Sequence, residues 1–238
     1  MSANIWKIEV DDQQQYLALE TREKGTTEAF ISVFRFDGTP VLLNYPLDER
    51  DWSLDSLQAS FVIFKKVGEN TPTKEGVLVY DFIQGREVLR TYEYHLVDVF
   101  KGFLKVKHRM FASGMETYFA LNTGTLDPDV SPGLLSLPKN HIIYPLAFTA
   151  QKPLFLESLE IDGELWMSRT DRNYLWCYHR KAEIGYELIL CISDLNHILA
   201  KEVILGDLEK KIPQPFFQVG DQLFLMSYNK QEIVSYLV

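Results

Sequence analysis

Short runs of alternating apolar and polar residues, separated by glycine-containing turns, constrain this chain more than any other sequence feature. Trp6, Ile8 and Val10 alternate with Lys7 and Glu9, and this period of two predicts a half-buried β-strand. Aromatic residues, which suit a pleated and partly buried surface, make up 13% of the chain. Further strand-like runs follow at residues 16–20, 29–36 and 40–43.

Turn signals lie between several pairs of these runs. Each is a dipeptide in which glycine supplies the positive φ that a tight hairpin turn requires. Recurring hairpins favour an antiparallel over a parallel architecture. The dipeptides are Asp37-Gly38, Gln84-Gly85, Lys101-Gly102, Asp162-Gly163 and Gly220-Asp221, the fourth between predicted strands at residues 155–161 and 164–168.

Helical signals are few. Residues 194–205, with Ser193 as a possible cap, and residues 47–57, with acidic residues near the start, are each expected to form a short helix. Neither is long enough to form a layer of the fold.

Two hairpin-like segments, residues 162–180 and 221–238, share one layout. Each has a turn, an apolar strand that ends in Met-Ser, a polar turn and an alternating aromatic strand. Strands 165–167 and 223–226 are apolar on both faces, which is typical of sheets stacked face to face in a propeller. Repeats of this size also fit propeller blades.

The pattern resembles the β-propeller superfold. It predicts a single all-β domain over residues 1–238, a small propeller of about five blades, in which the strand at residues 5–10 joins the C-terminal strands and closes one sheet. A β-sandwich or a barrel is the alternative. The Gly-His and Trp-Asp dipeptides of WD40 repeats are missing. The chain is also similar to bacterial proteins of uncharacterised families, a resemblance that implies no activity.

Composition and charge argue against nucleic-acid-binding and membrane-spanning classes of protein. The 238 residues are 46% hydrophobic and 24% charged, which is typical of a globular protein. The net charge of −9 argues against nucleic acid as a partner, because such partners require a cationic surface. No run reaches the length of a membrane span and the N-terminus lacks a signal peptide pattern. We therefore expect a soluble cytoplasmic protein without a membrane partner.

Common catalytic and metal-binding motifs are absent from the sequence. There is no P-loop, G-x-S-x-G, H-E-x-x-H or C-x-x-C pattern. No two of the five histidines lie close together in sequence, and Cys177 and Cys191 lie in apolar runs. We therefore expect neither a metal nor a cofactor.

Aromatic and polar residues near the C-terminus are the candidate binding residues. Tyr174, Trp176 and Tyr178 alternate and project from one face of a strand, and Trp166 lies on the preceding strand. If buried, these rings pack the core; if exposed, they form a stacking platform. The polar candidates nearby are Asp171 and His179.

Two functions remain open at this point. The first is a non-catalytic binding or interaction protein that holds a protein, peptide or carbohydrate with its loops. The second is a carbohydrate-active hydrolase or lyase in which acids such as Asp51 or Asp171 converge with His179. Fold alone does not decide between them.

Overall fold

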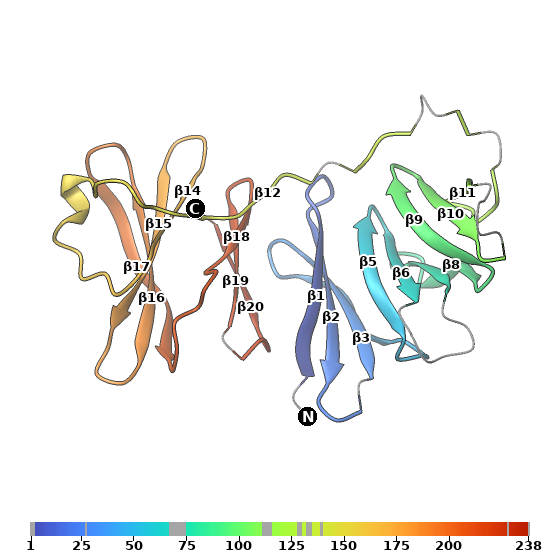
Figure 1. Ribbon diagram of the computed structural model, residues 1–238, viewed down its shortest axis with the longest axis horizontal. Helices are drawn as coiled ribbons and strands as arrows, with labels where there is room; N and C mark the ends of the chain where they lie inside the picture. The colour runs from blue at the N-terminus through green and yellow to red at the C-terminus, as the bar shows by residue number, and fades with distance from the viewer. Residues whose placement is uncertain are drawn as a thin grey trace. The chain divides into compact units, whose positions relative to one another are not determined.

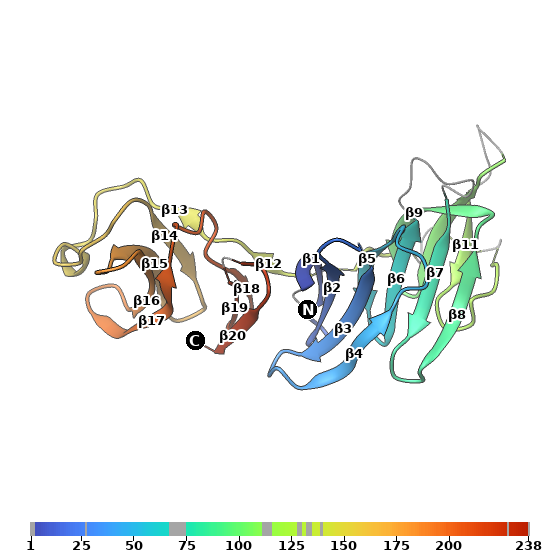
Figure 2. The ribbon, with the colours of Figure 1, turned by 90° about the horizontal axis from the view of Figure 1, so that it is seen from below.

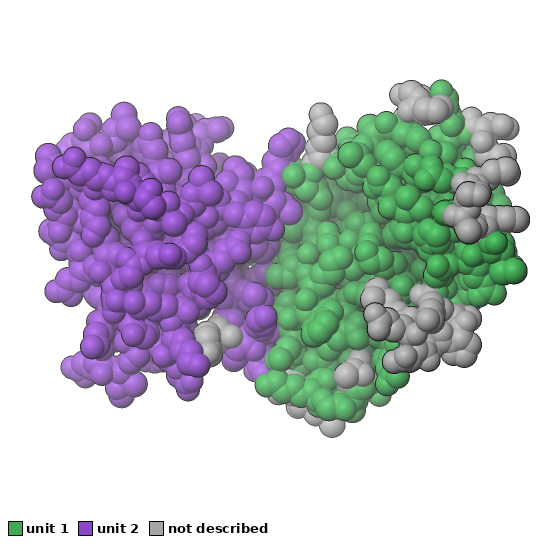
Figure 3. All heavy atoms as spheres, viewed as in Figure 1, with its two compact units in different colours: residues 1–140 green, residues 141–238 purple. Residues whose placement is uncertain are grey.

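The computed structural model describes residues 3–26, 28–66, 75–110, 116–127, 130–131, 135–138, 140–227 and 229–237. Over these residues the strands form five antiparallel sheets (Figure 1), and the helical structure is the 3-10 turn η2 (Leu154–Leu156). None of the described helical structure is long and apolar enough to cross a membrane. The chain divides into two compact units, residues 1–140 and 141–238 (Figure 3).

The first unit contains three sheets that follow one another in chain order (Figure 2). The first comprises β1 (Ala3–Asp11), β2 (Tyr16–Glu23), β3 (Ala29–Arg35) and β4 (Pro40–Pro46). The second comprises β5 (Trp52–Gln58), β6 (Phe61–Lys66), β7 (Val77–Asp81) and β8 (Arg86–Thr91). The third comprises β9 (Tyr94–Phe100), β10 (Phe103–His108) and β11 (Glu116–Ala120). In each sheet the strand first in sequence lies at one edge.

The second sheet is buried on both of its faces. Phe64 of β6 packs with Ile31 in a core shared with the first sheet, and Ile63 packs with Leu104 in a core shared with the third. All four side chains are fully buried. Each such burial stabilises the fold by about 1.5–3 kcal/mol. Sheets stacked face to face in this way are arranged like propeller blades.

The second unit contains two sheets with the strand orders β13-β14-β15-β16-β17 and β12-β18-β19-β20. The larger comprises β13 (Leu146–Ala147), β14 (Leu165–Arg169), β15 (Tyr174–Lys181), β16 (Tyr186–Ser193) and β17 (Ile198–Leu208). The smaller comprises β12 (Ile142–Ile143), β18 (Phe217–Val219), β19 (Gln222–Met226) and β20 (Ile233–Leu237).

The two sheets of the second unit also share a core. Leu175 and Leu188 of the larger sheet pack with Leu223 and Leu225 of the smaller one. On the other face of the larger sheet, the loop that contains Leu156 covers a second cluster. The prediction of an all-β, propeller-like chain of antiparallel hairpins is therefore confirmed.

Four of the five hairpin predictions are correct. Gly38, Gly85, Gly102 and Gly220 all have positive φ and connect adjacent antiparallel strands. The prediction at Asp162-Gly163 is wrong, because residues 155–161 form a loop with η2 rather than a strand. Apolar residues of this loop pack on the larger sheet without pairing with it. The loop is therefore as hydrophobic as a strand, although it is not one.

Both helix predictions are wrong. Residues 47–57 contain the start of β5, where a register irregularity lies between Leu54 and Ser56. This bulge places Leu54 and Leu57, three residues apart, in the same core, a spacing that mimics a helix. Residues 194–205 form a turn and then β17. The turn begins with Asp194, whose carboxylate accepts hydrogen bonds from the Asn196 and His197 amides.

The predicted burial of Trp6 is also wrong. The pairing of β1 with β2 shifts register between Ile5 and Lys7, and Trp6 lies at this irregularity with 67% of its surface exposed. A bulge turns a side chain out of the alternation that the sequence suggests. The neighbouring Ile5 is buried instead.

The C-terminal sheet is completed by a strand other than the predicted one. We expected the N-terminal strand to join the C-terminal strands, but β1 pairs with β2, and β12 completes the sheet of β18, β19 and β20. The short β1–β2 turn makes that local pairing entropically cheap. The blade number, the ring closure and the single domain stay predictions.

Candidate functional site

The predicted aromatic platform is mainly core. Tyr174, Trp176 and Tyr178 share one face of β15, as their alternation predicts, and belong to one cluster. Trp176 and Tyr178 are buried, while Tyr174 is half-buried. The indole Nε1 of Trp176 donates a hydrogen bond to Ser193 Oγ at 2.8 Å. A buried ring with its polar atom satisfied stabilises the sheet rather than a ligand.

Trp166 does not extend this row of rings. It pairs with Cys177 across β14 and β15, and it packs in the cluster on the opposite face of the sheet. The sheet separates Trp166 from the other three rings, so one ligand cannot stack on all four.

His179 is buried and serves the fold of the second unit. Its Nε2 accepts a hydrogen bond from the Ile212 amide at 3.0 Å. Burial lowers the pKa of His179, and the nearby Lys211 ammonium lowers it further. The side chain is therefore held neutral, with Nε2 as the acceptor that fixes the loop at Ile212.

Asp171 and His179, which were proposed for an acid–histidine site, do not converge. Asp171 is exposed in the turn before β15, whereas His179 lies near the other end of that strand. At about 3.3 Å per residue, Tyr174 and His179 alone are about 17 Å apart along β15. Asp51 belongs to the first unit.

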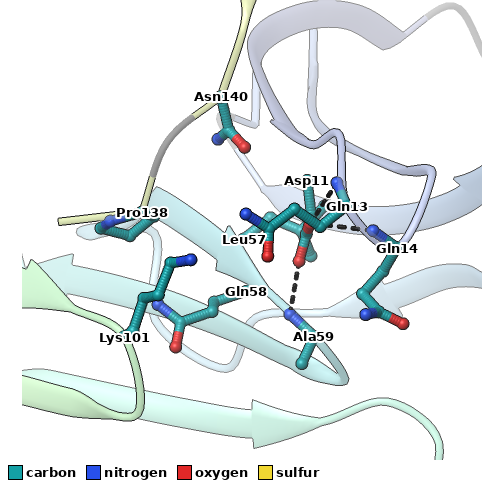
Figure 4. A pocket seen from close by; sticks show the side chains of 9 residues that line it. All are labelled: Asp11, Gln13, Gln14, Leu57, Gln58, Ala59, Lys101, Pro138 and Asn140. Atoms are coloured by element: carbon teal, nitrogen blue, oxygen red, sulfur yellow. Dashed lines mark hydrogen bonds between the residues drawn. The ribbon is translucent and has the colours of Figure 1, made fainter. Parts of the chain in front are cut away.

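A cavity of about 170 Å³ lies in the first unit where three turns meet (Figure 4). The turns are β1–β2, β5–β6 and β9–β10, each following the first strand of its sheet. Pro138 and Asn140 complete the wall. The lining residues are Asp11, Gln13, Gln14, Leu57, Gln58, Ala59, Lys101, Pro138 and Asn140.

The Asp11 carboxylate is already occupied by backbone donors. Its Oδ1 accepts hydrogen bonds from the amides of Gln13 and Gln14 at 3.0 and 3.1 Å, and its Oδ2 accepts one from the Ala59 amide at 2.6 Å. The residue is 7% exposed. A carboxylate in this setting positions two turns, and both of its oxygens are already engaged by backbone donors.

Two amide side chains connect the remaining walls. Gln58 Nε2 donates to the Phe100 carbonyl at 3.1 Å, while Gln58 Oε1 accepts from the Gly102 amide at 2.6 Å. Asn140 donates to the Val10 carbonyl and accepts from the Asp12 amide. The cavity walls are therefore held by hydrogen bonds before any ligand arrives.

Three lining side chains remain available to a ligand. The side chains of Gln13, Gln14 and Lys101 form no hydrogen bond or ion pair within the described residues. The Gln13 amide and the Lys101 ammonium both point into the cavity (Figure 4). Together they offer strong donors for an oxygen acceptor.

A second cavity, of about 350 Å³, adjoins the first and shares Leu57, Pro138 and Asn140 with it. Its volume falls in the usual range for ligand sites, about 300–1,000 Å³. The wall is mixed. Its aliphatic part contains Leu96, Val97, Val99, Leu137 and Pro138, and its polar part contains Asp55, Ser56, Lys65, Asp98 and Asn140. The Ser56 Oγ is buried and has no hydrogen-bond partner among the described residues.

Two ion pairs lie at the second cavity, and one of them, Lys65–Asp55, belongs to its wall. Lys65 pairs with Asp55 at 2.8 Å, and Lys7 pairs with Glu9 at 3.1 Å. Burial raises the pKa of Glu9, opposed mainly by the Lys7 ammonium. The Lys7 ammonium also donates to the Leu54 carbonyl at 2.7 Å. This bond, with a second from Lys7 to the Asp55 carbonyl at 3.2 Å, connects β1 with β5.

Sequence reasoning missed both cavities. Their residues come from turns far apart in the chain, and glutamine and lysine at a turn form no recognisable motif. The available signal was Asp11 at the start of a polar turn, since such aspartates cap turn amides. Within the described residues, no group of three or more His, Cys, Asp or Glu side chains could hold a metal ion.

No protein-family model matches the chain, and no curated protein matches it. Solved structures do. The β-propeller domain of the Trilobed protease from Pyrococcus furiosus matches with 10% identity and a TM-score of 0.36, covering 99% of this chain and 69% of that one. An uncharacterized protein from Listeria monocytogenes EGD-e matches with 7% identity and a TM-score of 0.39, covering 98% and 80%.

An oligogalacturonate lyase in complex with manganese also matches, with 11% identity and a TM-score of 0.30, over 100% of this chain and 77% of that one. These similarities concern the fold alone.

Proposed function

We propose that this protein is a non-catalytic binding protein whose first unit holds a small polar group of its partner in the cavity at the three turns. The proposal rests mainly on one observation. Among the described residues that line this cavity, Asp11 is the single carboxylate and is occupied by three backbone amides, while neutral amides and one ammonium group are available. Such groups bind and orient an acceptor, but they do not form an acid–base pair.

The partner classes that we propose are a peptide, a protein surface or a carbohydrate. A pre-formed wall favours binding because few side chains lose freedom when the ligand arrives. A bacterial origin and a cytoplasmic location complete the proposal. The location is supported by Cys177 and Cys191, which are both free thiols, as is usual in a reducing compartment.

The test is a screen of the full chain against peptide and glycan arrays. We expect the wild type to bind a subset of spots, and Gln13→Ala/Lys101→Ala to bind these at least about tenfold more weakly, because a hydrogen bond to a charged group contributes about 1.5–3 kcal/mol. Binding by the variant equal to that of the wild type, or a blank array with folded protein, would contradict the proposal.

The control variant is Gln84→Ala/Arg86→Ala in the β7–β8 turn. This turn is also capped by an aspartate, Asp81, but its side chains line neither cavity. The control should bind like the wild type. Cleavage of any glycan on the array would favour the hydrolase or lyase hypothesis instead.

A further inference from the structure

We infer that the two cavities together bind the C-terminal end of a peptide, with its free carboxylate in the first cavity and an apolar last side chain in the second. The inference rests on the proposed binding function and specifies its ligand. Three observations support it: the positive charge in the first cavity, the apolar residues in the second, and the residues that line both.

The first cavity suits a carboxylate. The Lys101 ammonium and the Gln13 amide point into it and have no partner among the described residues (Figure 4). Both are hydrogen-bond donors, and an ammonium–carboxylate bond is about twice as strong as a neutral one. The negative charge of Asp11 is offset by three backbone amides, so the cation determines which charge the cavity prefers.

The second cavity suits an aliphatic side chain. Leu96, Val97, Leu137 and Pro138 form its apolar part, beside the Lys65–Asp55 ion pair and Asp98, and Val97 and Leu137 are 43% and 54% exposed. Covering such side chains gains about 25 cal/mol for each Å² of apolar surface. Because Leu57 and Pro138 belong to both walls, a ligand can extend from one cavity into the other.

A peptide fits the lining better than an acidic sugar does. None of the described residues that line the two cavities is aromatic, whereas the faces of sugar rings stack on aromatic side chains. Peptide amides, in contrast, need hydrogen-bond acceptors. The second cavity supplies the Asp98 carboxylate and the Ser56 hydroxyl, whose oxygen is buried and unpartnered within the described chain.

The experiment compares two forms of one peptide. Fluorescein-labelled Ala-Ala-Ala-Leu is titrated with the full chain as the free acid and as the C-terminal amide, and anisotropy gives Kd. We expect the amide to bind at least about tenfold more weakly, since it loses the bond to a charged donor. Ala-Ala-Ala-Ser as the free acid should also bind more weakly, because it lacks the apolar side chain.

Two charge-matched variants locate the carboxylate. Lys101→Gln should abolish the difference between acid and amide. Lys24→Gln, which removes an exposed lysine in the β2–β3 turn that lines neither cavity, should preserve it. Val97→Asp should remove the preference for leucine over serine while leaving the preference for the acid.

Equal binding of acid and amide, or an unchanged preference in Lys101→Gln, would overturn the inference. If array spots other than free peptide C-termini bind and depend on Gln13 and Lys101, the proposed binding function stands and only the peptide assignment fails. If neither arrays nor peptides show binding that depends on these residues, both fail.

Discussion

The Oδ2 atom of Asp11 lies 2.6 Å from the backbone nitrogen of Ala59 and accepts its hydrogen bond. The other carboxylate oxygen accepts bonds from the Gln13 and Gln14 amides. One side chain therefore closes its own turn and ties it to the corresponding turn of the next sheet. The first cavity exists because these turns are held together.

Replacing Asp11 by Asn should destabilise the first unit by about 1–3 kcal/mol, because Asn keeps one acceptor for the turn amides and presents a donor to the Ala59 amide. Urea unfolding measures the loss. The control is Asp81→Asn. Within the described residues, Asp81 caps the β7–β8 turn through Oδ1, with bonds from the Ile83 and Gln84 amides, and Asn can reproduce both. Equal losses in the two variants would contradict this role of Asp11.

The stability of the second unit should fall as the pH drops below about 6.5, owing to His179. Burial lowers the pKa of His179 in the folded state from 6.5, so the unfolded chain takes up the proton first. The contribution of His179 is full above about pH 6.5 and declines as the pH falls toward the lowered pKa. Urea unfolding between about pH 7.5 and 5.5, followed by Trp fluorescence, measures it.

His179→Asn should flatten this pH dependence, since an amide oxygen can still accept the Ile212 hydrogen bond but does not titrate in this range. The matched control is His197→Gln. The His197 side chain is 79% exposed, and its replacement should leave the pH dependence of the wild type. The same slope in His179→Asn as in the wild type would show that other groups cause the loss.

Cys177 and Cys191 should resist both alkylation and disulfide formation in the native protein. They lie on neighbouring strands, but Cys177 pairs with Leu190 and Cys191 with Trp176, which places the two thiols on opposite faces of the sheet. Burial raises the pKa of Cys177 strongly and that of Cys191 to about 11, so little thiolate forms at neutral pH.

Mass spectrometry after iodoacetamide treatment tests this prediction. We expect labelling of neither thiol in native protein and of both in urea. A peptide cross-linked through Cys177 and Cys191 after mild oxidation would show that the register of β15 and β16 differs from the one described.

Local signals in the sequence predicted the hairpins. A turn such as that at Gly38 is specified by its own residues, because glycine readily adopts its φ of 85°. Strands are recognised from their own residues too, since their side chains either alternate between apolar and polar or, as in the first part of β2, are all buried. The bulge in β5 was not predictable in the same way, because Leu54 and Leu57 present a helical spacing. A bulge depends on the partner strand as well as on the sequence that contains it.

The candidate site depends on contacts between distant turns, and this explains why the sequence did not predict it. Asp11 and Gln58 end the first strands of two different sheets, and Lys101 lies in the first turn of a third. Each residue alone is an ordinary turn or strand-end residue. The aromatic residues, conversely, were conspicuous in sequence because the core uses them. Trp176 and Tyr178 show that a regular aromatic row indicates packing when both faces of its sheet are covered.

Gly185→Ala should destabilise the second unit more than Gly38→Ala destabilises the first. The two variants share the backbone strain, so the difference between their losses of stability measures the steric overlap at Gly185. Both glycines have positive φ, 73° and 85°, so alanine costs about 1–2 kcal/mol of strain at either site. A Cβ at Gly185 would lie 2.3 Å from the Leu208 carbonyl oxygen, whereas one at Gly38 meets nothing within 4 Å. The Leu208 oxygen is backbone and cannot rotate away, so Gly185→Ala must also shift the end of β17. Urea unfolding of both variants measures the two losses, and amide exchange near Leu208 should accelerate only in Gly185→Ala. Equal losses would mean that the strand end yields without cost and that strain alone determines the effect.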